Sequence, residues 1–240
     1  MKNGLKLVWI LIFVFGVQLT SNAQEDPPFN SKPIRYSLRA EGGISRLISP
    51  NALKSSFYPT GDFGLSFQLG LFKGFSAGIS FRYSSFQVDP QRLNVLVDTV
   101  IFEDGFSYEL PIRTYQNHLN PGIILGYDIW VDESVFFNFA VTSGISYTRY
   151  TKIRSKLQNK PKSDYNFQSF FIEPSASVFY VFEDYLGISF KVAYTYINGS
   201  FRPEKLGLDQ GVISYQSADL IGKIKYLTFS LGFVYSIKSF

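Results

Sequence analysis

The last segment of this chain alternates between apolar residues and mostly small ones. Its apolar positions are spaced by two and comprise Leu227, Phe229, Leu231, Phe233, Tyr235 and Ile237. The positions between them are Thr228, Ser230, Gly232, Val234 and Ser236. Because successive side chains of a β-strand point to opposite faces, this period of two predicts a strand with one apolar face and one face of small residues.

The same alternation recurs along the chain and predicts eight strands. They are expected at about Tyr36–Ile44, Phe63–Leu71, Phe75–Tyr83, Glu109–Ile129, Val135–Tyr147, Phe170–Phe182, Leu186–Tyr196 and Leu227–Ile237. Pro121 and Gly122 interrupt the fourth strand. After the N-terminal segment no stretch keeps a helical period, so an all-β fold is predicted.

The connections between these strands alternate between short and long. Tight turns are expected at Lys73-Gly74, Asp132–Ser134 and Glu183-Asp184, and longer connections at about 48–58, 88–108, 150–165 and 201–222. Transmembrane barrels have an even number of strands, short periplasmic turns and longer outer loops. The sequence therefore predicts a closed antiparallel eight-stranded transmembrane β-barrel.

The N-terminus has the pattern of a secretory signal. Lys2 and Lys6 precede an apolar stretch from Leu7 to Val17, and Ser21-Asn22-Ala23-Gln24 follows. The apolar stretch is shorter than the roughly 20 residues that a membrane-spanning helix needs, which favours a cleavable signal over an anchor. We expect residues 1–24 to be the signal peptide, 25–33 a Pro-rich periplasmic lead-in, and 34–240 a barrel in the cell outer membrane.

Composition narrows the function further. Removing Lys2 and Lys6 with the signal lowers the formal net charge from +4 by two, to +2, which gives no reason to expect a nucleic-acid partner. The chain has no cysteine, so disulfides, thiolate metal sites and a Cys-linked lipid anchor are excluded. Aromatic residues make up 18% of the chain, which suits strands that face lipid and end in aromatic belts.

A secreted, water-soluble barrel of the lipocalin kind is the main alternative, with its apolar face inward. Its outer face would be rich in charged residues. On the fifth strand, however, the second face consists of Asn138, Ala140, Thr142, Gly144, Ser146 and Thr148. Such small, uncharged residues suit the crowded interior of a narrow barrel, so we expect the apolar face to meet lipid.

The charged residues of the predicted strands fall on the inward face. They are Arg39, Glu41, Arg82, Asp128, Glu173 and Lys191. Side chains just fill the lumen of an eight-stranded barrel, so we expect a polar network of ion pairs and hydrogen bonds that plugs it. The alternative is a narrow, porin-like path for water or small solutes.

Catalysis and metal binding find little support in the sequence. His118 is the single histidine, and no serine stands two residues from it. Nucleophilic catalysis generally pairs a histidine with a nucleophile, so we expect no catalytic residues, no metal site, no cofactor and no enzyme activity.

The third long connection concentrates positive charge. Its basic residues are Lys152, Arg154, Lys156, Lys160 and Lys162. Lysine and arginine bind phosphate well, and lipopolysaccharide phosphates are the nearest anions outside an outer membrane. The hypothesis is that this loop contacts lipopolysaccharide or another anion, and the alternative is a solvated basic loop.

The chain resembles the small outer-membrane β-barrel family that includes PorT-like proteins and, more distantly, the OmpA-type transmembrane barrel. The resemblance rests on the signal ending Asn22-Ala23-Gln24, on Glu109-Leu110-Pro111-Ile112, and on the alternating strands up to the C-terminus. It implies insertion by the outer-membrane assembly machinery. Phe240 departs from the family pattern, because it is out of phase with the apolar face of the last strand.

Together these observations predict a monomeric, non-enzymatic barrel with a structural, scaffolding or surface-interaction role. The expected partners are outer-membrane lipids including lipopolysaccharide, the assembly machinery, and a secretion or surface partner that the sequence does not identify. PorT-like relatives imply an accessory role in protein secretion. A narrow channel for small solutes is the alternative function.

Overall fold

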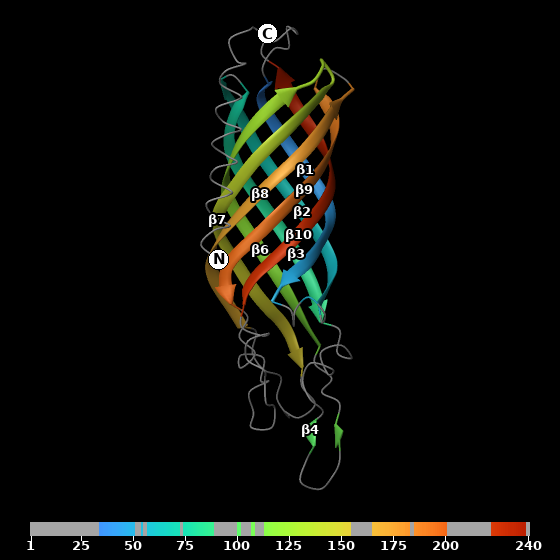
Figure 1. Ribbon diagram of the computed structural model, residues 1–240, viewed down its shortest axis with the longest axis vertical. Coiled ribbons are helices and arrows are strands. Elements are labelled where there is room, and N and C mark those ends of the chain that lie inside the picture. Colours follow the sequence, from blue (N-terminus) through green and yellow to red (C-terminus); the bar gives the residue numbers. More distant parts are fainter. Residues whose placement is uncertain are drawn as a thin grey trace, which may run out of the picture. The chain divides into compact units, whose positions relative to one another are not determined.

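The described residues form a closed antiparallel β-barrel of eight strands (Figure 1). The computed structural model describes residues 34–50, 54, 57–72, 74–88, 100–101, 107–108, 113–154, 165–182, 185–200 and 222–238. The barrel strands are β1 (Ile34–Ser49), β2 (Phe57–Phe72), β3 (Phe75–Val88), β6 (Arg113–Trp130), β7 (Val135–Arg154), β8 (Tyr165–Val181), β9 (Leu186–Ser200) and β10 (Lys223–Lys238). The predicted fold class and strand number are confirmed.

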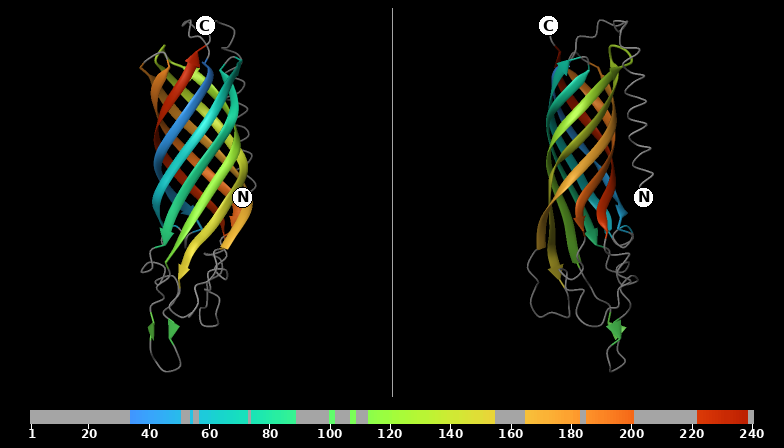
Figure 2. Two further views of the ribbon diagram at one scale, coloured as in Figure 1. Left: turned by 180° about the vertical axis from the view of Figure 1, so that it is seen from behind. Right: turned by 60° about the vertical axis from the view of Figure 1, so that its left-hand side comes forward.

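Each strand pairs with its neighbours around the ring in the order β1-β10-β9-β8-β7-β6-β3-β2, and β2 pairs again with β1. The views in Figure 2 show the wall continuing around the whole barrel. Closure pairs the backbone donors and acceptors within the wall, which is what a sheet needs in order to cross lipid. In the described part of the chain no helix is long and apolar enough to cross a membrane.

Three short turns join strands at one end of the barrel, called here the short-turn end. Gly74 has a φ of +84° between β2 and β3, a backbone conformation that glycine adopts easily. In the β6–β7 turn, Asp132 Oδ1 accepts hydrogen bonds from the backbone N–H groups of Ser134 and Val135, both at 2.7 Å. The other four connections are longer and define the long-connection end.

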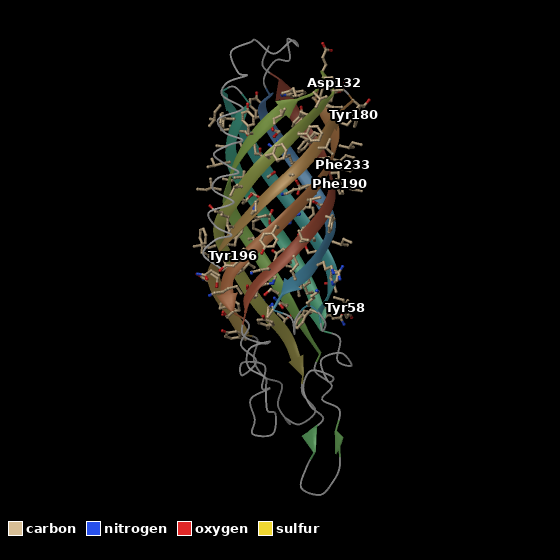
Figure 3. The ribbon with its side chains drawn as sticks, in the orientation of Figure 1. Tyr58, Asp132, Tyr180, Phe190, Tyr196 and Phe233 are labelled. Carbon is tan, nitrogen blue, oxygen red and sulfur yellow. The ribbon has the colours of Figure 1, made fainter. Side chains whose placement is uncertain are left out.

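The apolar face of the strands is on the outside. Leu231 and Phe233 keep 69% and 71% of their surface exposed, and the alternate residues of β10 are buried inside. Figure 3 shows Phe190 and Phe233 on the outer wall, with Tyr58 and Tyr196 nearer the long-connection end. A wall of this kind is stable in contact with lipid rather than water, so the water-soluble alternative with an apolar interior is wrong.

Pro121 and Pro174 lie within β6 and β8 without ending either strand. Leu119 on β6 pairs with Tyr147 on β7, and the next pair is Gly122 with Gly144, in the same register. Proline has no N–H to give the ladder, so the interruption stays local. The predicted break in the fourth strand is therefore a lapse in pairing, and β6 runs from Arg113 to Trp130.

Two features differ from the predicted boundaries. The sequence placed Lys152 and Arg154 in the third long connection. In the structure β7 continues to Arg154, so both residues lie in this strand. Within the second long connection, β4 (Val100–Ile101) and β5 (Ser107–Tyr108) form a separate two-stranded sheet that the sequence did not predict. The outer part of the strand predicted to begin at Glu109, residues 109–112, lies outside the described residues, as does Phe240.

Candidate functional site: the charged lumen

Arg82 on β3 lies at the centre of a network of charged side chains inside the barrel. Its Nε is 2.9 Å from Asp62 Oδ1, its Nη1 is 3.0 Å from Glu173 Oε1, and its Nη2 is 3.6 Å from Glu41 Oε2. These four side chains are all more than nine-tenths buried. The planar guanidinium has five N–H donors, so one arginine links carboxylates from β1, β2 and β8.

Lys191 on β9 supplies a second cation to two of these carboxylates. Its Nζ is 3.3 Å from Glu41 Oε2 and 3.4 Å from Glu173 Oε1. Two cations and three carboxylates from five different strands therefore meet in the lumen. Because an isolated buried charge is costly, it is the alternation of sign that allows these groups to be buried together.

Hydroxyl groups complete the coordination of this charge network. Ser45 and Ser84 donate to Asp62 Oδ2 at 2.7 and 2.5 Å, and Thr195 donates to Glu173 Oε2 at 2.7 Å. These small inward residues satisfy carboxylate oxygens that the cations do not reach. A buried polar network is stable only when its members are paired in this way.

A second polar cluster lies nearer the short-turn end. Arg39 Nη1 donates to Asn138 Oδ1 at 3.2 Å, and Asn138 Nδ2 donates to Asp128 Oδ1 at 2.6 Å. The Arg39 guanidinium carbon also lies 4.4 Å from the centre of the Phe179 ring. Phe179 stacks on Phe136 with the ring centres 4.5 Å apart. Together with Val181 and Val234, the two rings form a buried apolar cluster at this end of the barrel.

A third cluster, built around His118, lies nearer the long-connection end. One ring nitrogen, Nε2, is 2.7 Å from Gln116 Nε2, and the other, Nδ1, is 2.9 Å from Thr148 Oγ1. The imidazole stacks on the Tyr226 ring, and Phe86 meets both rings edge-on. His118, Phe86 and Tyr226 have no exposed surface, so this aromatic cluster is fully buried inside the barrel.

Some buried polar atoms have no hydrogen-bond partner among the described residues. They include Gln68 Nε2, Gln116 Oε1, Asn120 Oδ1, Thr142 Oγ1, Ser146 Oγ and Ser189 Oγ. Buried polar groups are costly when unpaired, and single internal waters commonly satisfy them. The lumen therefore has places that suit isolated waters between the polar and aromatic clusters.

The six lumen residues singled out from the sequence all lie in strands, but they form two groups. Glu41, Arg82, Glu173 and Lys191 come together, whereas Arg39 and Asp128 belong to the separate cluster joined by Asn138. Sequence reasoning missed Asp62, which makes the shortest ion pair with Arg82. The sequence could have indicated Asp62, because it lies at the same alternate, inward positions of β2 as Gly64, Ser66 and Gln68.

The basic residues predicted to contact lipopolysaccharide cannot be placed as a group. Lys156, Lys160 and Lys162 lie outside the described residues, as do the side chains of Lys152 and Arg154. For metals, the described part of the chain contains no group of three or more histidine, cysteine, aspartate or glutamate side chains arranged to hold an ion.

Comparison with known proteins finds similar barrels but no sequence relative. No protein-family model matches the chain, and no curated protein matches it. Among solved structures, the Neisserial surface protein A is 10% identical, with 84% of this chain and 97% of that one covered at a TM-score of 0.47.

The outer membrane protein OprG from Pseudomonas aeruginosa is 14% identical, with 87% and 98% covered at a TM-score of 0.45. The outer membrane protease OmpT from Escherichia coli is 10% identical, with 89% and 99% covered at 0.40. Likeness at this level assigns no function to this chain.

Proposed function

We propose that this protein is a monomeric, non-enzymatic barrel of the outer membrane whose lumen is sealed and whose role is carried by its surface. That role is structural, scaffolding or surface-interacting. The observation that supports it most is the Arg82 network, in which side chains from five strands meet in the middle of the lumen.

The lipid-facing wall and the alternation of short and long connections support the location and orientation. In transmembrane barrels the short turns are periplasmic and the longer loops are outside. We therefore assign the short-turn end to the periplasm and the long-connection end to the cell exterior. The predicted signal at residues 1–24 agrees with export.

A narrow channel is the second candidate, and the unpaired polar atoms favour it. Gln116 Oε1, Asn120 Oδ1 and Ser146 Oγ are buried without a hydrogen-bond partner among the described residues and would accept hydrogen bonds from water. Conduction also requires a continuous path, and the stacked rings of Phe136 and Phe179 oppose one at the short-turn end. Hydrated pockets within a sealed barrel account for both observations.

Catalysis has to be weighed on this chain's own residues, since a protease is among the similar barrels. Ser84 is the cross-strand partner of His118, which brings a hydroxyl and an imidazole to adjacent strands. However, Ser84 Oγ donates to Asp62, and both His118 nitrogens have other polar neighbours. This arrangement argues against a nucleophile and base pair, and so supports a non-enzymatic role.

The partners proposed for this role are outer-membrane lipids including lipopolysaccharide, the assembly machinery during insertion, and a surface partner. An accessory role in protein secretion is the more specific proposal, and it rests on the resemblance to PorT-like barrels. Outer loops are where such a partner would bind, because loops carried on a rigid scaffold commonly form binding sites.

Single-channel conductance of the refolded protein in a planar bilayer tests the sealed lumen. We expect no steps from protein whose insertion is verified by its heat-dependent migration in gels. Steady, ion-selective steps would overturn the proposal in favour of the channel. In that case Arg82→Gln should alter the ion selectivity, whereas the wall variant Ile79→Ala should not.

A further inference from the structure

Among the side chains that the structure describes, the charged ones on the outside of the barrel are sorted by sign between its two ends. Among the described residues, the exposed acidic side chains are Asp132 and Glu133, both in a turn at the short-turn end. The outward basic side chains that the structure describes lie at the long-connection end and are Arg46, Lys54, Arg149, Lys223 and Lys225. The remaining described acidic residues, Glu41, Asp62, Asp128 and Glu173, face the lumen.

Strand pairing brings three of these cations together. Arg46 on β1 is opposite Leu227 on β10, and Lys225 is the next outward residue of β10. Diagonal neighbours on one face of a sheet lie about 7–8 Å apart, within reach of long side chains. Lys223 is two residues before Lys225, on the same face of β10 and nearer the long-connection end. We call Arg46, Lys223 and Lys225 the basic patch.

Aromatic and backbone contacts from β9 border the basic patch. Lys225 lies opposite Tyr196, and its Nζ is 5.8 Å from the centre of the Tyr196 ring. Lys223 Nζ donates to the Asn198 carbonyl at 3.1 Å. An ammonium has three donors, so Lys223 keeps donors for a ligand. Figure 3 shows Tyr196 on the wall, nearer the long-connection end.

The wall beside the basic patch becomes strongly apolar toward the middle of the barrel. Ile44 on β1 pairs with Phe229 on β10, and Leu231 is the next outward residue. Ile44 and Leu231 keep 63% and 69% of their surface exposed. Cations beside the exposed apolar residues Ile44, Phe229 and Leu231 can bind a ligand that has an anionic head and acyl chains. A soluble anion would contact the cations but not these apolar residues.

We propose that the basic patch binds a phosphate group of an outer-leaflet lipid of the lipid A type, with its acyl chains along Ile44, Phe229 and Leu231. This inference rests on the proposed function, because the long-connection end must face the outer leaflet. It differs from the loop site predicted from the sequence, since its cations stand on the walls of β1 and β10. Lysine and arginine hold phosphate through charge-assisted hydrogen bonds.

The test measures binding of bisphosphoryl lipid A to the refolded protein in neutral detergent by native mass spectrometry. The variant R46Q/K223Q/K225Q should bind it roughly 100-fold more weakly than the wild type, at about a factor of 5 for each cation lost. The control variant K54Q/R149Q removes cations of the same end outside the patch. It should change binding of lipid A little, because Lys54 and Arg149 lie outside the basic patch and the neutral detergent has no anionic surface to which they could be attracted.

A second ligand separates phosphate recognition from acyl-chain contact. Dephosphorylated lipid A should bind the wild type and the triple variant equally. Equal binding of bisphosphoryl lipid A by the wild type and the triple variant would overturn the patch, as would an equal loss in the control variant. Heat-dependent gel migration shows that each variant is folded. Conductance by the wild type would overturn the sealed lumen without altering these binding results, so the two proposals fail separately.

Discussion

At the scale of single residues, Arg39 and Arg82 show two ways to bury a guanidinium. Both are 3% exposed. Arg82 contacts three carboxylates directly, whereas Arg39 donates to Asn138 and lies over the Phe179 ring, with Asp128 reached through Asn138. Removing each arginine should therefore leave a different amount of uncompensated charge behind.

We expect Arg82→Gln to lower the free energy of unfolding by about 3–5 kcal/mol, because Asp62 would lose the cation it pairs with and Glu41 and Glu173 would keep Lys191. Arg39→Gln should cost less, about 1–3 kcal/mol, since Asp128 keeps its hydrogen bond from Asn138. Urea titration in phospholipid vesicles measures both, with fluorescence from Trp130, the one tryptophan after residue 24. A larger loss for Arg39→Gln would contradict the assigned roles.

At the scale of strands, sequence alternation predicted which face of each strand points outward, because a period of two is a local property. It could not predict which inward charges meet, since that depends on the stagger between strands. This is why Arg39 and Asp128 could not be assigned to a different cluster from Glu41 and Arg82 beforehand. Near the barrel end, polar residues are accommodated on both faces of β7, so the alternation weakens and its extension to Arg154 was missed.

Close contact between strands explains one of the glycines on the inward face. A methyl group on Gly144 would overlap the carbonyl oxygen of Pro121 and come within 3.1 Å of the Phe171 ring. Gly42, on the outer face of β1, has no atom within 4 Å of the same position. Gly144 is therefore needed for space, whereas Gly42 is not.

We expect Gly144→Ala to destabilise the barrel by about 1–3 kcal/mol, as overpacking of a filled interior does. Gly42→Ala should be neutral or stabilising by up to about 1 kcal/mol, because alanine restricts the unfolded chain. The same urea titration compares the two variants with the wild type. Equal effects would show that the crowding at Gly144 does not limit stability.

At the scale of the whole molecule, the barrel separates three environments. The lumen holds the ion pairs, the middle of the outer wall is apolar, and outward charges lie at the two ends. This arrangement reverses that of a water-soluble protein, and it makes the cost of a new charge depend on its height on the wall. Leu231 lies near the middle of β10, and Leu227 lies beside the basic patch.

Leu231→Arg should therefore destabilise the protein by about 2–4 kcal/mol in phospholipid vesicles, the cost of placing a cation at the bilayer midplane. Leu227→Arg should cost about 0–1 kcal/mol, because an arginine near the interface extends its charge into the headgroups. Both substitutions replace leucine by arginine on the same face of β10, so the two variants differ in the depth of the new charge in the bilayer. Equal costs at both positions, measured by urea titration, would contradict a bilayer centred on Leu231 and the assignment of the basic patch to the headgroup region.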